Sequence, residues 1–200
     1  MDPQVKALTE MINELEGNLE AEFAKQRAKL NFGLERGKVV FEQEILRRHR
    51  ELRIGLVRYV LGARPLVVLT CPVIYSVIIP LALLDLFASL YQAVCFPVYG
   101  IEKVRRADHL VFDRHQLAYL NAVQKLNCAY CSYATGLIGY VREIVARTEQ
   151  HWCPIKHARR VIGAHANYAA YVDYGDGEAF RQRIDEMRAA RLNRTPPAID

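Results

Sequence analysis

The longest apolar stretch of the chain, from Pro65 to Ile101, limits what this sequence can fold into more than any other feature. Its only charged side chain is Asp85. Because a helix needs about 20 apolar residues to cross a bilayer, the stretch is too long for one straight crossing and barely long enough for two. A carboxylate inside a single span costs about 3 kcal/mol, whereas at a turn Asp85 caps a second helix that begins at Leu86. The sequence therefore predicts a membrane helical hairpin.

Basic residues flank this stretch on both sides. Those before it are Arg47, Arg48, Arg50, Arg53, Arg58 and Arg64, and those after it are Lys103, Arg105 and Arg106. Since basic flanks mark the cytoplasmic side of a membrane segment, we expect both ends on that side, with a hairpin that either crosses twice or re-enters. The alternative is a hairpin buried in a soluble protein, but the chain has little other apolar sequence to cover it.

The net charge of +5 also raises nucleic acid as a partner. The basic residues gather at the ends of the apolar stretch, however, and neither interleaved aromatic residues nor a nucleic-acid-binding motif accompanies them. This distribution favours the lipid bilayer over nucleic acid as the partner.

Residues 4–53 have the pattern of one long amphipathic helix. Its apolar positions are Leu8, Ile12, Leu15, Leu19, Phe23, Leu30, Leu34, Phe41, Ile45 and Leu52. Their spacing has a period of about 3.67 residues, which keeps the stripe on one face of a helix. Such a stripe favours a helix–helix contact, including self-association of the chain into a homo-oligomer through a coiled coil. Attachment of this helix to the membrane surface is less favoured, because its polar face carries as many acids as bases.

These patterns predict a mainly α-helical chain in four parts. The parts are an amphipathic helical arm over residues 1–53, a membrane hairpin with basic flanks over 54–106, a cytoplasmic helical module over 107–192 and a disordered tail over 193–200. The acidic N-terminus lacks the features of a secretory signal. The chain has 5 cysteines, an odd number, which favours reduced thiols in the cytosol over disulfides.

Three of the cysteines accompany a histidine in the C-terminal module. Cys128 and Cys131 form a C-x2-C pair, and Cys153 and His157 belong to the segment WCPIKH. Three thiolates and one imidazole match the ligand set of a closed, tetrahedral zinc site. The sequence thus makes Cys128, Cys131, Cys153 and His157 candidate ligands of a structural Zn²⁺.

Helix geometry sets a condition on this zinc site. In an unbroken helix from Cys128 to Gln150, the two halves of the motif would lie about 30 Å apart. The site therefore requires the chain to fold back at Gly136 and Gly139.

Two other interpretations of the cysteines stay open. Cys128 and Cys131 share a helix face and have the spacing of two packed, free thiols. They also have the spacing of a dithiol redox pair, which is favoured when C-x-x-C begins a helix. The βαβ pattern that usually accompanies such a redox pair is missing from the sequence.

Three segments of the chain resemble a group of uncharacterised bacterial membrane-associated proteins. The segments are PVIYSVIIPLALLDLFASLYQAVCFPVYGIEKVRR, YLNAVQKLNCAYCSYATGLIGYVREIVARTEQHWCPIKHARR and YVDYGDGEAF. The resemblance covers roughly residues 55–185, and WCPIKH is its most specific part. It implies a bacterial inner-membrane location and brings no activity, substrate or site residues with it.

The sequence as a whole favours a protein that binds over one that catalyses. We expect a membrane-anchored interaction or scaffold protein with both termini in the cytoplasm, an unidentified protein partner and a zinc-bound C-terminal module. The alternative is a membrane-associated thiol redox or electron-transfer factor that uses Cys128 and Cys131. None of the familiar nucleotide-binding, hydrolase or metalloprotease motifs occurs in the chain.

Overall fold

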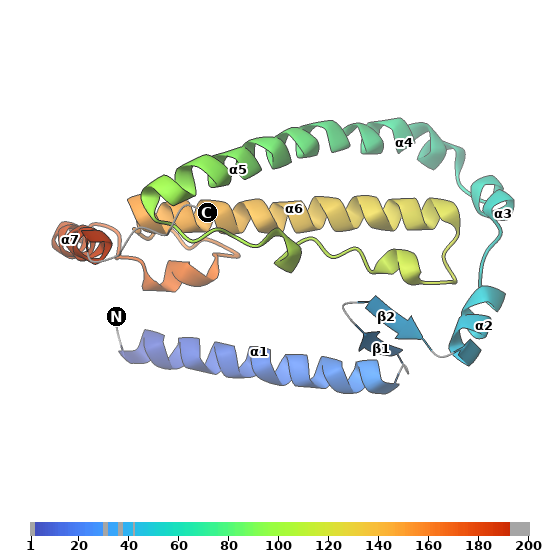
Figure 1. The fold of residues 1–200 in the computed structure, drawn as a ribbon, viewed down its shortest axis with the longest axis horizontal. Coiled ribbons are helices and arrows are strands. Elements are labelled where there is room, and N and C mark those ends of the chain that lie inside the picture. Colours follow the sequence, from blue (N-terminus) through green and yellow to red (C-terminus); the bar gives the residue numbers. More distant parts are fainter. Residues whose placement is uncertain (1–2, 30–31, 36–37, 42, 193–200) are drawn as a thin grey trace. The chain divides into compact units, whose positions relative to one another are not determined.

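A computed structural model of the protein describes residues 3–29, 32–35, 38–41 and 43–192, and these residues are mainly helical, as predicted (Figure 1). The chain forms two compact units. Unit 1 comprises Met1–Ile78 and Val111–Thr135, and unit 2 comprises Ile79–Leu110 and Gly136–Asp200. The predicted disordered tail, residues 193–200, lies outside the described residues.

The N-terminal part of unit 1 is a helix followed by a strand pair. Helix α1 (Pro3–Lys29) precedes strands β1 (Phe32–Glu35) and β2 (Lys38–Phe41), which pair antiparallel with Phe32 opposite Phe41, and helix α2 (Gln43–Glu51) follows. The prediction of one helix over residues 4–53 is therefore wrong in its middle. Glycines weaken a helix by about 1 kcal/mol each, and the β-branched and aromatic run KVVF favours a strand.

The remainder of unit 1 contains the first part of the apolar stretch. After helix α3 (Leu56–Leu61), helix α4 (Pro65–Ser76) begins with a proline at its first position, where no helical N–H is needed. The Tyr75 hydroxyl bonds to the Asn127 side chain, and the Tyr130 hydroxyl donates to the Ile74 carbonyl at 2.9 Å. Both Asn127 and Tyr130 belong to the first half of helix α6 (Ala122–Trp152), so one side of α4 is fixed to that helix.

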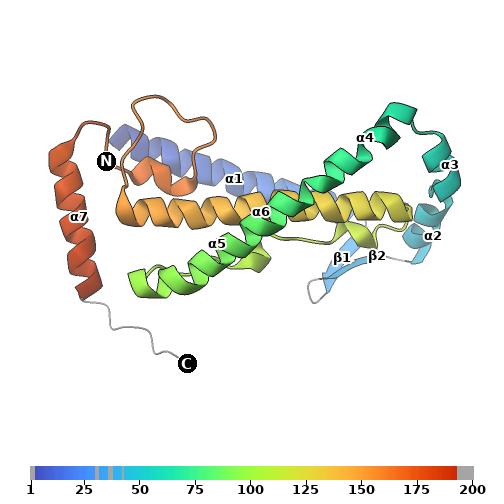
Figure 2. The same ribbon diagram turned by 90° about the horizontal axis from the view of Figure 1, so that it is seen from above.

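Unit 2 is built on two helices that are joined by side-chain hydrogen bonds. Helix α5 (Ile78–Tyr99) lies over the second half of α6 in Figure 1 and crosses it obliquely in Figure 2. A short 3-10 turn (Arg106–Asp108), another (Ala166–Ala170) and helix α7 (Gly177–Leu192) complete the unit. Its core side chains are Phe96, Val104, Leu137, Tyr140, Ile144 and Tyr171, each at most 4% exposed.

The apolar stretch does not reverse direction at Asp85. This residue lies within α5, and Val77, the one residue between α4 and α5, keeps a right-handed helical backbone with φ −62° and ψ −17°. The predicted hairpin turn at Asp85 is therefore wrong. The carboxylate bonds to an arginine distant in the sequence, and so it does not need to cap a helix.

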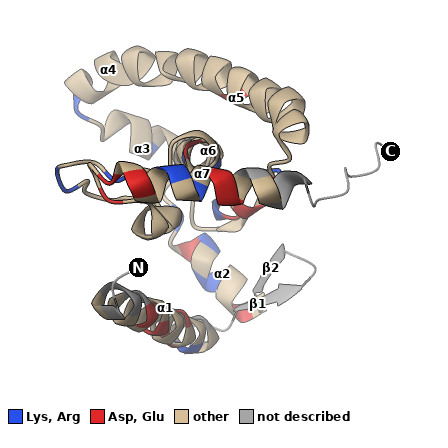
Figure 3. Cartoon of the chain, turned by 90° about the vertical axis from the view of Figure 1, so that its left-hand side faces the viewer, with Lys and Arg blue, Asp and Glu red and all other residues tan. Residues whose placement is uncertain are grey.

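One apolar segment of the described chain is long enough to cross a membrane. It covers Pro65–Tyr99 with a mean hydropathy of 2.4. Figure 3 shows the contrast in charge: α4 and α5 are almost free of charged residues, whereas acidic and basic residues alternate along α7.

Candidate functional site

The cysteine and histidine motif is spread along a continuous helix and the loop after it. Helix α6 runs without a break from Ala122 to Trp152, past both glycines that were predicted to interrupt it. At a rise of 1.5 Å per residue, the distance along the chain from Cys131 to Cys153 is about 33 Å, whereas zinc ligands must all lie within about 2.3 Å of one ion. Among the described residues, no group of three or more His, Cys, Asp or Glu side chains could hold a metal ion.

Gly136 has a packing role in α6. A Cβ atom at Gly136 would lie 2.6 Å from the His109 carbonyl oxygen and 3.0 Å from the Leu110 Cα. Only glycine allows the segment around His109 to approach the helix this closely. The sequence feature taken as a helix break is thus a contact between α6 and another part of unit 2.

His157 has a tyrosine as its neighbour. The Tyr168 hydroxyl accepts a hydrogen bond from the His157 backbone N–H at 2.6 Å and lies 3.3 Å from His157 Nδ1. Cys153 is exposed. The four predicted ligands Cys128, Cys131, Cys153 and His157 are therefore not brought together, and the fold-back that the zinc site required is absent from α6.

The C-x2-C pair lies beyond the start of its helix. Helix α6 begins at Ala122, so Cys128 and Cys131 both lie beyond its first turn. The helix dipole acts mainly within that first turn. Cys131 is exposed and Cys128 half-buried, and both are free thiols. The position at a helix start, which favoured a dithiol redox pair, is not observed.

The face of α5 toward the rest of unit 2 carries polar groups, all of them bonded. We call Asp85, Ser89, Gln92 and Phe96 the inner seam of α5. Their spacing of four, three and four residues places them on one face of a helix. Three of the four are polar although they lie in an otherwise apolar sequence. The spacing of these polar residues is visible in the sequence and is the signal that identifies the inner seam.

Gln92 is the centre of a buried hydrogen-bond network. Its Oε1 accepts from the Val104 backbone N–H at 2.7 Å, and its Nε2 donates to the Tyr140 hydroxyl at 2.9 Å and to the Val104 carbonyl at 3.3 Å. Gln92 is only 7% exposed. The side chain therefore joins α5, the segment after it and α6, and satisfies backbone groups that would otherwise be buried without a partner.

Asp85 is paired with Arg106. The two make a bidentate ion pair in which Arg106 Nη2 donates to Asp85 Oδ2 at 2.7 Å. The Ser89 hydroxyl donates to the same carboxylate at 3.3 Å, and the guanidinium lies 5.7 Å from the centre of the Tyr140 ring. Bidentate pairs of this kind are geometrically specific. They fix Asp85 on the inner side of α5.

The opposite face of α5 is apolar and exposed. We call it the outer face of α5; its residues, exposed by between 51% and 78%, are Leu83, Leu86, Phe87, Leu90, Val94 and Val98. Exposed contiguous apolar surface on this scale marks contact with a protein, a ligand or a membrane.

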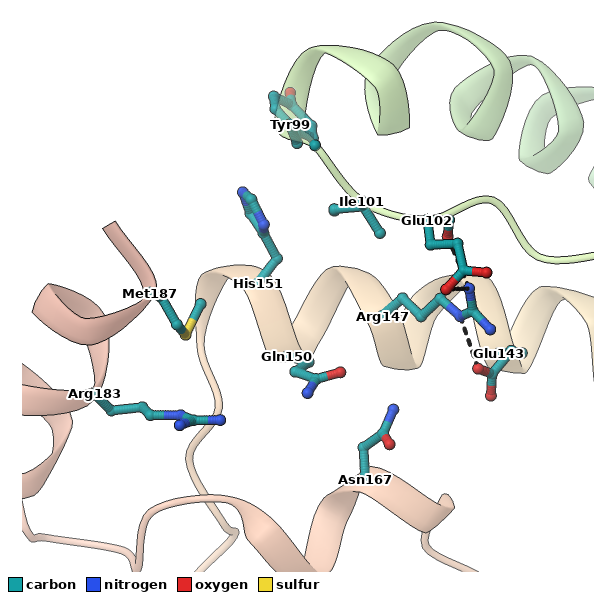
Figure 4. Close-up of a pocket in the computed structure, with 11 residues that line it drawn as sticks. Tyr99, Ile101, Glu102, Glu143, Arg147, Gln150, His151, Asn167, Arg183 and Met187 are labelled. Atoms are coloured by element: carbon teal, nitrogen blue, oxygen red, sulfur yellow. Dashed lines mark hydrogen bonds and ion pairs between the residues drawn. The ribbon is translucent and has the colours of Figure 1, made fainter. Parts of the chain in front are cut away.

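A cavity of about 450 Å³ lies beyond the end of α5 (Figure 4). Arg147, in its wall, donates to Glu143 at 2.9 Å and to the Glu102 carbonyl at 2.8 Å, and so holds the segment after α5 against α6. The side chains of Arg183, Gln150 and Asn167 point into the space between α6 and α7 (Figure 4). Guanidinium and amide groups bind polar ligands, but this set contains no nucleophile paired with a base.

Strand-like pairing and hydrogen bonds hold residues 171–173 of unit 2 near the end of α6. Ile155 pairs with Val172 in a parallel bridge, and Lys156 donates to Asp173 at 2.8 Å. This hydrogen bond, with the charge of Lys156, holds the pKa of Asp173 below its usual range. The buried Tyr171 hydroxyl donates to the Ala146 carbonyl at 3.1 Å, and burial raises the pKa of Tyr171.

No protein-family model, curated protein or solved structure matches this chain.

Proposed function

We propose that this protein is a membrane-attached scaffold that binds lipid through the outer face of α5 and protein through its other surfaces. The observation that carries the proposal is the division of α5 into two faces. Gln92 on the inner seam is 7% exposed and fully engaged, whereas Val98 on the outer face is 78% exposed. An apolar face without a partner in the described fold needs an external one, and lipid accepts it without hydrogen bonds.

The size of the outer face supports lipid attachment. Burial of a Leu, Val or Phe side chain contributes about 1.5 to 3 kcal/mol, so six partly exposed ones give on the order of 5 to 10 kcal/mol before the costs of association. The basic residues Lys103 and Arg105 lie in the segment that follows α5, after Glu102. Each basic residue near an anionic lipid surface adds about 1 kcal/mol. In a bacterium the corresponding surface is the cytoplasmic side of the inner membrane, with both termini of the chain in the cytoplasm.

The stripe on α1 is the proposed contact for protein. Leu8, Met11, Ile12, Leu15, Leu19 and Phe23 are between 49% and 60% exposed. Acidic and basic residues accompany the stripe, as in the Lys25–Glu22 pair at 3.2 Å. A face of this kind suits a second α1 helix, which makes a homo-oligomer of the chain the simplest partner.

Vesicle flotation tests lipid attachment. The full-length protein is mixed with vesicles that contain anionic lipid, and the floating fraction is measured for the wild type and for a variant carrying Phe87→Asp and Leu90→Asp. Each charge placed in the apolar region costs about 2 kcal/mol or more, so the double variant should bind on the order of a thousandfold more weakly.

The matched control carries Leu15→Asp and Leu19→Asp on α1. It should float like the wild type and lose only self-association, measured as the molar mass in sedimentation equilibrium. A wild-type protein that stays with the soluble fraction at every lipid composition contradicts the proposed function.

A further inference from the structure

We infer that α5 does not cross the bilayer but lies in the plane of its surface, with the outer face in the acyl region and the inner seam held on unit 2. This inference rests on the proposed attachment to lipid and states how α5 is oriented relative to the bilayer. The length and hydropathy of the segment alone would suggest a crossing helix. Three features of unit 2 argue against one.

The first feature is the bonded inner seam. A crossing α5 must either expose Asp85 and Gln92 to lipid or keep their partners Arg106, Val104 and Tyr140 beside it. Exposure breaks a bidentate ion pair and the network that satisfies the Val104 backbone. Unsatisfied polar groups in hydrocarbon cost several kcal/mol each. The inner seam therefore stays on unit 2.

The second feature is the charge of the helix beside α5. The half of α6 that packs on α5 carries Arg142, Glu143, Arg147 and Glu149. A charged residue at the centre of a spanning helix costs about 3 kcal/mol. Because the hydrogen bond between Tyr91 and Thr148 at 3.1 Å joins α5 to this half, a crossing α5 would bring these charges into the membrane.

The third feature is the segment that follows α5. It is largely non-helical, and it contacts α6 near Arg147, through the Glu102 carbonyl, and again at Gly136, through His109. Along α6 these points are about 16 Å apart, a large part of the roughly 30 Å of hydrocarbon. Irregular backbone is not tolerated in lipid unless protein covers it. A charged loop of this length beside α5 therefore requires water on the inner side.

These three features place α5 at the membrane surface. A helix that lies in the interface buries its apolar face about 5 to 10 Å into the boundary of headgroups and acyl chains. The side chain of Arg105, six residues after α5, is exposed and lies 3.9 Å from Asp108, and we expect its guanidinium to bind phosphate groups of anionic lipids in competition with that carboxylate. The partner is thus a bilayer with anionic lipid in the contacted leaflet, which the protein contacts from one side.

Depth measurements along the outer face test this geometry. In full-length protein whose native cysteines are replaced, single cysteines at Leu83, Phe87, Leu90, Val94 and Val98 are labelled with a nitroxide and bound to vesicles. The immersion depth is measured from collision rates with oxygen and with a water-soluble nickel complex. An in-plane helix gives nearly equal depths at the five positions. A crossing helix gives a maximum near the middle, since Leu83 and Val98 are about 22 Å apart along the axis.

Hydrogen exchange provides a second measurement that needs no substitution. The Val104 amide donates to Gln92, so it should exchange slowly in the vesicle-bound wild type if the inner seam is intact. Equal depths with a protected Val104 amide support the inference. A depth maximum near Leu90, or rapid exchange at Val104 in the bound protein, overturns it while lipid attachment stands. A wild-type protein that does not float overturns the proposed function itself.

Discussion

Helices α5 and α1 both expose apolar side chains, yet they differ on their other faces. In α5 the opposite side is a seam of bonded polar groups around the fully buried Phe96. In α1 the other positions are exposed acids and bases, such as Lys25 and Glu22. The inner seam makes α5 part of a folded body, whereas α1 displays a charged helix surface. An exposed apolar stripe therefore does not define its own partner; the chemistry of the other face does.

This difference also separates lipid from protein as the partner. Lipid offers no hydrogen bonds, so a helix face in contact with it must be free of unsatisfied polar groups, as the outer face of α5 is. A helix that carries both acidic and basic residues is better suited to water and to another helix with complementary charges. The comparison can be tested by changing one face of α5 at a time.

The largest effect is expected from Phe96→Ala. Phe96 is 0% exposed, and truncation of a buried phenylalanine costs about 3 to 5 kcal/mol because a cavity remains. Its matched control is Val98→Ala on the outer face, 78% exposed, for which the change is under about 0.5 kcal/mol. The free energy of unfolding of unit 2, measured by urea denaturation of the full chain, distinguishes them. Equal losses in both variants would contradict the division of α5 into two faces.

The next effect is expected from Gly136→Ala. The added Cβ would lie 2.6 Å from the His109 carbonyl oxygen, so either α6 or the segment at His109 must move. Overpacking of this kind costs about 1 to 3 kcal/mol.

Gly139→Ala is the control for this variant. Its Cβ would lie at 3.4 Å from the His109 ring, close to an ordinary contact, and alanine improves helix propensity by about 1 kcal/mol. Thermal unfolding followed by circular dichroism should show a lower midpoint for Gly136→Ala only. Similar midpoints for the two variants would mean that Gly136 has no role in close packing.

Gln92→Leu is expected to have an effect of about the same size as Gly136→Ala or smaller. The leucine fits an apolar environment but leaves the Val104 N–H and the Tyr140 hydroxyl without Gln92, at a cost of about 1 to 3 kcal/mol. Leu90→Gln, a change of reverse chemistry on the outer face, should leave the free energy of unfolding nearly unchanged and weaken flotation with vesicles. A higher free energy of unfolding for Gln92→Leu than for the wild type would contradict the stabilising role of the inner seam.

The sequence predicted the helical class and the apolar segment, because composition and periodicity are local properties. It did not predict the role of Asp85 or of Gly136. A carboxylate in an apolar stretch is compatible with a cap or with an ion pair, and the partner Arg106 becomes apparent only when the chain folds. A glycine in a helix is likewise compatible with a break or with a close contact. In both cases the deciding atom comes from a segment remote in sequence.

The single helix over residues 4–53 and the fold-back at Gly136 and Gly139 were predicted wrongly for related reasons. The apolar period of the arm continues through KVVF, where β-branched residues prefer the observed strand pairing. The zinc prediction counted suitable ligands and depended on a fold-back, but α6 stays helical through Gly136 and Gly139. Ligand type is visible in a sequence, whereas convergence of ligands depends on the path of the backbone.

The smallest effect is expected at the Lys156–Asp173 pair, away from both faces of α5. Because the hydrogen bond from Lys156 lowers the pKa of Asp173 in the folded protein, the carboxylate form favours folding. This contribution is present above the pKa of an unfolded aspartate, about 3.9, and is lost as the pH falls through the lower folded value. Asp173→Asn should therefore lower the unfolding midpoint slightly at pH 7, by an amount that shrinks as the pH falls through the folded pKa of Asp173. The side chain of Asp173 is 80% exposed, which keeps the effect small.

Lys156→Gln should reproduce the result for Asp173→Asn at pH 7, and the double variant should lose no more than either single variant. The pair lies next to the bridge between Ile155 and Val172 and is not part of α5. We therefore expect that neither variant alters flotation with vesicles. A loss of flotation in these variants would mean that this segment, and not only α5, contributes to lipid binding. A difference from the wild type that does not shrink as the pH falls would show that Asp173 acts through something other than its charge.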